Sequence, residues 1–288
     1  LTGNPTRNTG FFYDTHHRLK EFWTTMHVSC MESPRVSDDF INDMKIRYGE
    51  DSPAYHVRVL GNFPPSEEDT VIPVSFVDHA MQNKVEVAET TTAIWGLDVA
   101  RKGGDSSVLC RRQGPLIHPL TVWKGLDLMQ LTGAVKAEYD LMSPSRRPVE
   151  IIVDSNGFGA GVLDRLRELE LPARGLNVSE ASSSKQTYLN LRAELWFKTK
   201  AWLAGMDVQL PNDDLLFAEL VAPRYFFTSS GKIQVESKDA MKRRKIASPD
   251  RADAVCLCLA TDNTTMRYGV SSLGAWARPL KRNIKGVV

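Results

Sequence analysis

Two apolar segments of this chain each run into an aspartate and then into a glycine-rich turn. The first is residues 94–100, which carry Asp98, and the second is residues 151–154, which end in Asp154. Apolar runs of this length bounded by glycine are typical of strands covered on both faces. A carboxylate at the end of such a strand lies at the sheet edge, where open α/β folds bind their ligands. A third acid, Asp253, lies in the sequence SPDRADAV, which opens an apolar helical stretch.

If these three carboxylates converge, they could hold divalent cations. Two carboxylates about 4 Å apart repel each other by roughly 4 kcal/mol at an effective dielectric near 20, and a cation removes this conflict. Oxygen ligands without Cys or His favour Mg²⁺ or Mn²⁺. Two such ions can activate a water and stabilise the leaving oxygen of a phosphodiester. We therefore predict metal-assisted phosphodiester hydrolysis, with Asp98, Asp154 and Asp253 as catalytic metal ligands and Asp105 as a further candidate ligand.

The simpler interpretation of an aspartate after a strand is a turn or a helix cap. We prefer it for Asp250, because Ser-Pro-Asp before an apolar helix is a helix start signal. Asp253 lies further inside that helix beside apolar residues, so its carboxylate needs a partner.

A basic cluster lies just before the third acid and comprises Lys238, Lys242, Arg243, Arg244 and Lys245. Such a run is usually a solvated face. Next to a candidate phosphodiesterase site it is also a candidate DNA-binding surface that contacts phosphates. No base-reading motif is visible, which favours binding without sequence specificity. The six histidines have no metal-like spacing, and we assign them no role.

The composition is that of a soluble globular protein, with 42% hydrophobic and 25% charged residues. No apolar run approaches the roughly 20 residues that span a bilayer, and no signal peptide opens the chain, so we expect no membrane partner. The four cysteines lack zinc-like spacing with histidine and are expected to be reduced, mostly packed thiols of a cytosolic protein. Because the chain begins with Leu1, we expect it to be a fragment of a longer one.

From residue 92 onward the order of elements is legible. Three short strands at 92–100, 106–112 and 117–123 are expected to form an antiparallel meander. The later elements are expected to be a helix at 127–141, a strand at 150–154, a helix at 159–169, a strand at 173–178, a helix at 186–204, a hairpin of 225–228 with 232–236, and a helix at 248–260. This is the order of a ribonuclease H-like fold, an α/β mixed sheet flanked by helices. Its first and fourth strands are adjacent, which would bring Asp98 and Asp154 side by side.

Upstream, residues 38–48 are expected to form a helix capped by Ser37 and stopped by Gly49. Residues 64–69, PPSEED, are expected to be a linker. A short helix and a connector are expected in residues 74–90, and a loose basic tail after residue 262.

These motifs resemble the large terminase subunit of tailed bacteriophages, the motor-nuclease that packages DNA into the capsid. The resemblance rests on GLDVA at 96–100, on VDSNGFG at 153–159 and on DRADA at 250–254. It implies that Asp98, Asp154 and Asp253 take the places of the family's three metal-binding acids, which hold two Mg²⁺ or Mn²⁺ ions. It also implies that Asp105 matches an acid that some members use for a second ion.

The N-terminal part is similar to the end of the same family's ATPase domain. GNPT at 3–6 resembles its coupling loop, and residues 47–49 and 57–64 resemble the segment that closes that domain. No Gly-x-x-x-x-Gly-Lys-Ser/Thr loop occurs in the chain, so we expect no ATP hydrolysis from it. The resemblance implies an ATPase-domain remnant at 1–65, a linker at 66–90, a ribonuclease H-like nuclease domain at 91–265 and a basic tail at 266–288.

The function implied is a Mg²⁺- or Mn²⁺-dependent endodeoxyribonuclease that cuts double-stranded concatemeric DNA in the cytoplasm of the bacterial host. ATP-driven translocation is implied only for the intact parent chain. The implied partners are double-stranded DNA, the portal protein and the small terminase subunit, with a ring oligomer on the portal.

Three alternatives remain open at this point. An actin-like or sugar-kinase-like phosphotransferase shares the ribonuclease H-like core but requires two such cores. A transposase or junction resolvase would also cut DNA with carboxylates, but it does not explain the motifs upstream of residue 65. A non-catalytic module that docks on the portal or small subunit would have no reason to gather three acids.

Overall fold

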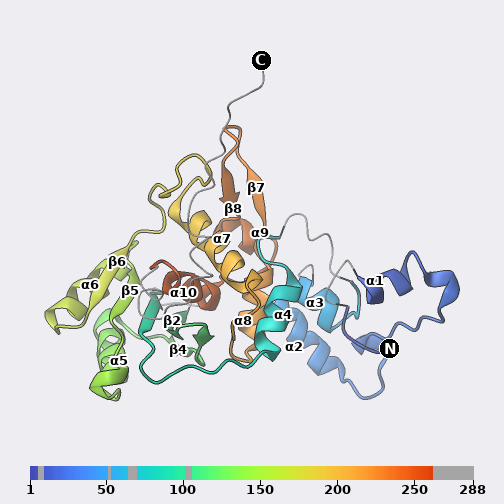
Figure 1. Ribbon diagram of the computed structural model, residues 1–288, viewed down its shortest axis with the longest axis horizontal. Helices are drawn as coiled ribbons and strands as arrows, with labels where there is room; N and C mark the ends of the chain where they lie inside the picture. Colours follow the sequence, from blue (N-terminus) through green and yellow to red (C-terminus); the bar gives the residue numbers. More distant parts are fainter. Residues whose placement is uncertain (6–9, 51–52, 64–69, 101–105, 262–288) are drawn as a thin grey trace.

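The computed structural model describes residues 1–5, 10–50, 53–63, 70–100 and 106–261. Among these residues, the central feature is a six-stranded mixed sheet with the order β3-β2-β1-β5-β6, in which β4 pairs with β2 beside this row (Figure 1). Its strands are β1 (Ala93–Asp98), β2 (Ser106–Gln113), β3 (Leu116–Ile117), β4 (Thr121–Lys124), β5 (Glu150–Asp154) and β6 (Ala173–Leu176).

Helices cover both faces of this sheet, which explains the unbroken apolar runs of β1 and β5. Because side chains alternate along a strand, Trp95 and Leu97 of β1 pack with helices α5 and α6, whereas Ile94 packs on the opposite face with α7, α8 and α10. Figure 1 shows the two layers on either side of the strands. The helices of the two layers are α5 (Leu128–Asp140), α6 (Gly159–Glu168), α7 (Leu191–Ala204), α8 (Asp214–Val221) and α10 (Asp250–Cys258).

The predicted adjacency of the first and fourth strands is confirmed. β1 pairs in parallel with β5, and the register sets Leu97 opposite Val153. Asp98 and Asp154 follow these two residues and therefore end neighbouring strands at the same edge of the sheet.

Residues 117–123 were predicted to form one strand, but the structure has two short strands in its place. Both β3 and β4 pair with β2, and Pro119 lies between them. Proline has no N–H to donate to a sheet ladder, so it interrupts the strand at this point.

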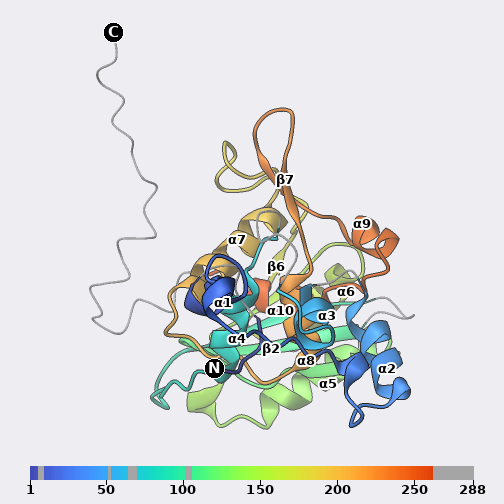
Figure 2. The same ribbon diagram turned by 90° about the vertical axis from the view of Figure 1, so that its right-hand side faces the viewer.

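Helix α7 begins at Leu191 rather than at residue 186, because the side chain of Asn190 caps it by accepting a hydrogen bond from Ala193 N. Among the described residues after 92, two α-helices were not expected from the sequence. One is α8, capped by Asp213, and the other is α9 (Lys238–Arg243), capped by Ser237. The predicted hairpin is present as β7 (Tyr225–Phe227) and β8 (Ile233–Val235), and Figure 2 shows it projecting from the body.

The N-terminal residues pack against the same core as the helices on one face of the sheet. Tyr55, Val57 and Val59 are almost fully buried in the cluster that also contains α7, α8 and α10. Arg58 forms an ion pair with Asp214 at the start of α8 and lies 3.9 Å from the centroid of the Phe217 ring. The N-terminal helices are α1 (Phe11–His16), α2 (Asp38–Tyr48), α3 (Pro53–Arg58) and α4 (Val74–Gln82).

The predicted caps of α2, Ser37 and Gly49, are both confirmed. Helix α4 lies in the segment expected to connect the two parts of the chain, and its residues Val74 and Val77 join the common core. The expected linker at 64–69, Asp105 and the expected tail after 262 lie outside the described residues. In the described part of the chain, no helix has the length and apolar character needed to cross a membrane.

Candidate active site

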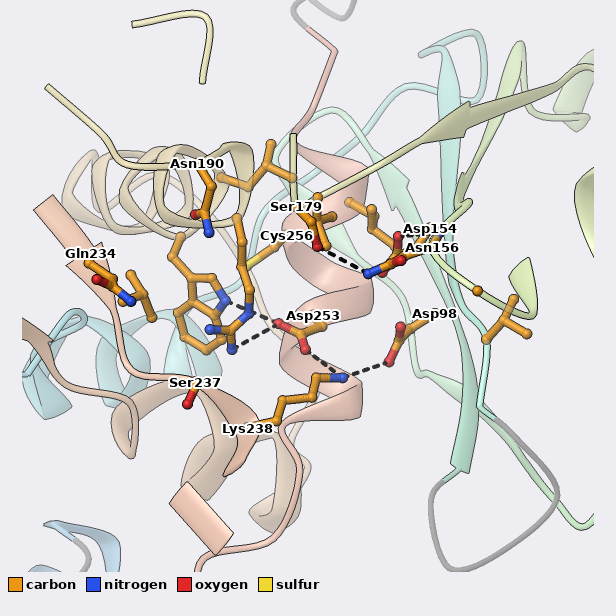
Figure 3. A pocket seen from close by; sticks show the side chains of 18 of the residues that line it. Asp98, Asp154, Asn156, Ser179, Asn190, Gln234, Ser237, Lys238, Asp253 and Cys256 are labelled. Atoms are coloured by element: carbon orange, nitrogen blue, oxygen red, sulfur yellow. Dashed lines mark hydrogen bonds and ion pairs between the residues drawn. The ribbon is translucent and has the colours of Figure 1, made fainter. Parts of the chain in front are cut away.

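A cavity of about 470 Å³ lies at the carboxyl ends of β1 and β5 (Figure 3). Asp98 enters it from the end of β1 and Asp154 from the end of β5, while Asp253 enters from the first turn of α10. The three acids predicted from the sequence therefore line one cavity, although they lie far apart along the chain. Glycine makes this approach of elements feasible, because a Cβ on Gly96 in β1 would come within 2.4 Å of the Ala254 carbonyl oxygen in α10.

The ammonium group of Lys238 lies among these acids. Its Nζ is 2.9 Å from Asp253 Oδ2, 3.7 Å from Asp98 Oδ2 and 3.5 Å from Asp250 Oδ1. Burial lowers the pKa of Lys238, but the attraction of these carboxylates outweighs it and raises the pKa above its usual value. Lys238 therefore partly balances the negative charge of the acids.

The environments of Asp98 and Asp154 both disfavour the charged form. Burial raises the pKa of Asp98 to about 8, and the nearby carboxylates add to this effect while Lys238 opposes it. Burial also raises the pKa of Asp154, partly offset by the backbone N–H of Asn156, which donates to Oδ1 at 3.0 Å. Additional positive charge in the cavity would favour ionisation of both.

Asp253 has the partner that its position predicted. Trp196 Nε1 donates a hydrogen bond to Asp253 Oδ1 at 3.0 Å, and Arg192 Nη2 lies 3.6 Å from the same oxygen. Burial raises the pKa of Asp253, but the charges of Arg192 and Lys238 and the hydrogen bonds from Lys238 and Trp196 outweigh burial and lower it. Asp253 is therefore the acid whose ionised form this environment favours.

The interpretation of Asp250 as a helix cap is wrong. Its Oδ2 accepts a hydrogen bond from Ser106 N at the start of β2, at 3.0 Å, so its carboxylate faces the sheet. The first turn of α10 is instead satisfied by Glu219 of α8, whose Oε2 accepts from Arg251 N at 2.6 Å and from Ala252 N at 3.1 Å. Asp250 thus ties α10 to the sheet beside the cavity.

The basic cluster does not form one surface. Lys238 faces the acids, and Arg244 pairs with Glu236. Lys242, Arg243 and Lys245 have exposed side chains on and after α9.

The donor set matches a hard cation in kind, because Asp98, Asp154 and Asp253 offer only oxygens. In the part of the chain that the structure describes, no three His, Cys, Asp or Glu side chains form a ready-made metal centre. A divalent cation would instead compete with the Lys238 ammonium for the same oxygens. The residues thus fit a metal ion chemically, and in this structure the Lys238 ammonium supplies positive charge beside these oxygens.

Arg192 and Trp196 were not predicted as site residues. They are four residues apart on a helix and therefore share a face, but a tryptophan on an amphipathic helix is normally a core residue. Their spacing alone carries no signal for a site.

No protein-family model matches the chain. A curated relative, the probable terminase large subunit of Enterobacteria phage P7, is 26% identical over 286 residues. The match covers 90% of this chain and 56% of that protein, so the chain spans a little over half the length of this relative.

Solved structures of terminase nucleases share the fold. The nuclease domain of the large terminase subunit gp2 of bacterial virus Sf6 superposes with a TM-score of 0.55 at 18% identity, over 66% of this chain and 98% of that one. The large terminase nuclease from thermophilic phage G20c with bound magnesium gives 0.51 at 17% identity, over 68% of this chain and 99% of that one. The predicted mixed sheet flanked by helices is confirmed as the ribonuclease H-like fold of these nucleases. The sequence match and the shared fold confirm the expected resemblance: the chain is similar to the large terminase subunits of phages.

Proposed function

We propose that this chain is a metal-dependent endonuclease of a phage DNA-packaging terminase, which cleaves double-stranded concatemeric DNA. The observation that carries the proposal is the convergence of Asp98, Asp154 and Asp253, from three separate elements, on one cavity. The likeness to nuclease domains that were solved with manganese and with magnesium supports it.

In this proposal Asp98, Asp154 and Asp253 are the catalytic acids and hold two Mg²⁺ or Mn²⁺ ions, with Asp105 as a further ligand. The bound ions would supply an activated water and stabilise charge on the leaving oxygen of the phosphodiester. Before cations bind, Lys238 neutralises the acids and keeps the cavity stable. Asp250 holds the start of β2 against α10, which keeps the strand end of Asp98 next to Asp253.

DNA would be held by its phosphates. The proposed DNA-binding residues are those of the basic cluster, of which Lys242, Arg243 and Lys245 are exposed. Contacts of this kind are salt-dependent and carry no sequence information. The proposed enzyme therefore binds DNA with little sequence preference.

The wider assembly is part of the same proposal. The partners are the portal protein and the small terminase subunit, in a ring on the portal, within the cytoplasm of the bacterial host. The proposed division of the chain is an ATPase-domain remnant at 1–65, a linker at 66–90, a nuclease domain at 91–265 and a basic tail at 266–288. ATP-driven translocation belongs to the parent chain.

Plasmid digestion tests the nuclease directly. The wild type is incubated with supercoiled plasmid and Mn²⁺, Mg²⁺ or a chelator, beside Asp154→Asn and the matched control Asp164→Asn, an exposed aspartate of α6. We expect metal-dependent nicking by the wild type and by Asp164→Asn, and none by Asp154→Asn. Cleavage that persists in chelator, or full activity of Asp154→Asn, would refute the proposal.

A further inference from the structure

Helix α7 presents a hydrogen-bond donor and a guanidinium cation, one turn apart, to a single oxygen of Asp253. Trp196 Nε1 donates to Oδ1 at 3.0 Å, and Arg192 Nη2 approaches the same atom to 3.6 Å. The other oxygen, Oδ2, faces Lys238 Nζ at 2.9 Å. Figure 3 shows the Asp253 carboxylate with the Lys238 ammonium beside it. The two oxygens of this acid are thus distinguished by their surroundings.

Both side chains are themselves fixed. Trp196 is fully buried, so its ring cannot swing away from the carboxylate. Arg192 donates through Nη1 to the Glu236 carbonyl oxygen at 2.7 Å, and its guanidinium lies 5.7 Å from the Trp196 ring centroid. The pair therefore forms a rigid support for Oδ1.

A purely structural role would not need the indole N–H. A phenylalanine would fill much of the same space without creating a buried donor that requires an acceptor. Here the acceptor is the acid that lines the cavity, and the contact consumes Oδ1 only.

We propose that Trp196 and Arg192 are positioning residues for metal binding: by holding Oδ1 they fix the plane of the Asp253 carboxylate and leave Oδ2, which faces Lys238, available to a cation. This inference rests on the proposed function. Groups that hydrogen-bond to a ligand orient it, and their loss typically weakens metal affinity roughly 10- to 100-fold. We also expect catalysis to survive the loss of either support when enough cation is supplied, because the Asp253 carboxylate itself is still present.

The test compares Trp196→Phe with Trp95→Phe. Trp95 is 1% exposed and Trp196 is 0% exposed, but Trp95 packs on the opposite face of the sheet, away from the cavity. Mn²⁺ affinity is measured by isothermal titration calorimetry, with thermal melts to compare stability. We expect affinity to fall roughly tenfold in Trp196→Phe and to stay unchanged in Trp95→Phe. Equal affinities in the two variants would overturn the inference.

Plasmid cleavage against Mn²⁺ concentration supplies a second readout. In Trp196→Phe the Mn²⁺ concentration that gives half-maximal cleavage should rise, while the cleavage rate at saturating Mn²⁺ should stay close to that of the wild type. General loss of structure would lower the maximal rate as well. If Trp196→Phe does not fold, Arg192→Lys carries the test, because a lysine cannot reach both Glu236 and Asp253 with a planar fork. Wild-type Mn²⁺ affinity in Arg192→Lys would then overturn the inference. A wild type that neither binds Mn²⁺ nor cuts would instead refute the proposed function.

Discussion

Lys238 places a positive charge among the acids of the cavity, at the position where a metal ion would also be attracted. Its Nζ contacts three carboxylates at once, so any divalent ion must outcompete it. At about 4 Å and an effective dielectric near 20, two unit charges interact by roughly 4 kcal/mol. The ammonium would therefore strongly influence how tightly the proposed site binds metal.

Replacing Lys238 by alanine should tighten Mn²⁺ binding by about tenfold or more, because a competing charge is removed from the acids. Calorimetric titration measures this. Lys198→Ala is the control, since Lys198 is equally exposed but pairs with Glu194 instead. Weaker Mn²⁺ binding in Lys238→Ala would show that the lysine supports the cation rather than replacing it.

Glu194 is a buried acid on α7, and its role is structural. Its carboxylate accepts hydrogen bonds from Ser182 Oγ at 2.7 Å and from Ser183 N and Oγ at 2.8 and 2.6 Å. Burial alone would raise the pKa of Glu194, but these bonds and Lys198 lower it to about 2. The charged form is therefore stabilised by folding.

Because the folded-state pKa of Glu194 lies below its unfolded value near 4.5, its contribution is fully present above pH 4.5 and is lost as the pH falls towards 2. Glu194→Gln should lower the free energy of unfolding by about 1–3 kcal/mol at pH 7. The difference from wild type should shrink at pH 3. Urea unfolding at the two pH values measures this, and a difference that stays constant would contradict the assignment.

Among the secondary-structure elements, the contact between β1 and α10 is the one that assembles the site. Gly96 allows it, because a Cβ at that position would lie 2.4 Å from the Ala254 carbonyl oxygen and 2.9 Å from Cys258 N. The distance between Asp98 and Asp253 thus depends on a residue without a side chain.

Gly96→Ala should separate the two elements, destabilise the fold by about 1–3 kcal/mol and reduce metal-dependent cleavage. Gly133→Ala in α5 is the matched control, since its Cβ would meet nothing within 4 Å. Alanine at that helical position should stabilise the fold by about 0.5–1 kcal/mol. Thermal melts and plasmid digestion of both variants measure these effects, and a neutral Gly96→Ala would argue against a tight β1–α10 contact.

Elements with a clear local signal could be predicted from the sequence. The strands that carry Asp98 and Asp154 are unbroken apolar runs, and the hairpin has a Ser-Ser-Gly turn. Helix α8 was missed because residues 215–218, LLFA, are apolar all round and show no helical periodicity. The true start of α7 depends on Asn190, which is one of several polar residues in that loop.

Parts of the site could not be read from local sequence, because they depend on tertiary contacts. Asp250 looks like a cap until Glu219, 31 residues earlier, is seen to bond the first turn of α10. Lys238 belongs to a basic run in the sequence, and only the cap at Ser237 and the turn of α9 direct it at the acids. Trp196 looks like a core residue in the sequence, and its ring is indeed buried in the core, but its N–H donates to Asp253.

Across the molecule, the N-terminal residues are joined to the sheet domain through a common core. Tyr55, Val57 and Val59 pack with α8, and Arg58 pairs with Asp214. Helix α8 in turn holds α10 through Glu219. Packing thus connects the N-terminal segment to the helix that carries Asp253.

Deleting residues 1–62 should therefore destabilise the sheet domain itself. A fully buried side chain of this kind contributes about 1.5–3 kcal/mol, so losing Tyr55, Val57 and Val59 should cost on the order of 5 kcal/mol. Deleting only residues 1–28 retains all three and is the control. Chemical denaturation of both truncations measures the difference, and equal stability would mean that the N-terminal segment is dispensable to the core.

The order in which the acids occur along the chain has a consequence for biosynthesis. Asp98 and Asp154 leave the ribosome well before Asp253, whose helix α10 is the last element described and must dock across β1. Long-range pairing of this kind forms late in folding. A nascent or half-folded copy therefore lacks the assembled group of three acids, and under the proposed function it could not cut DNA.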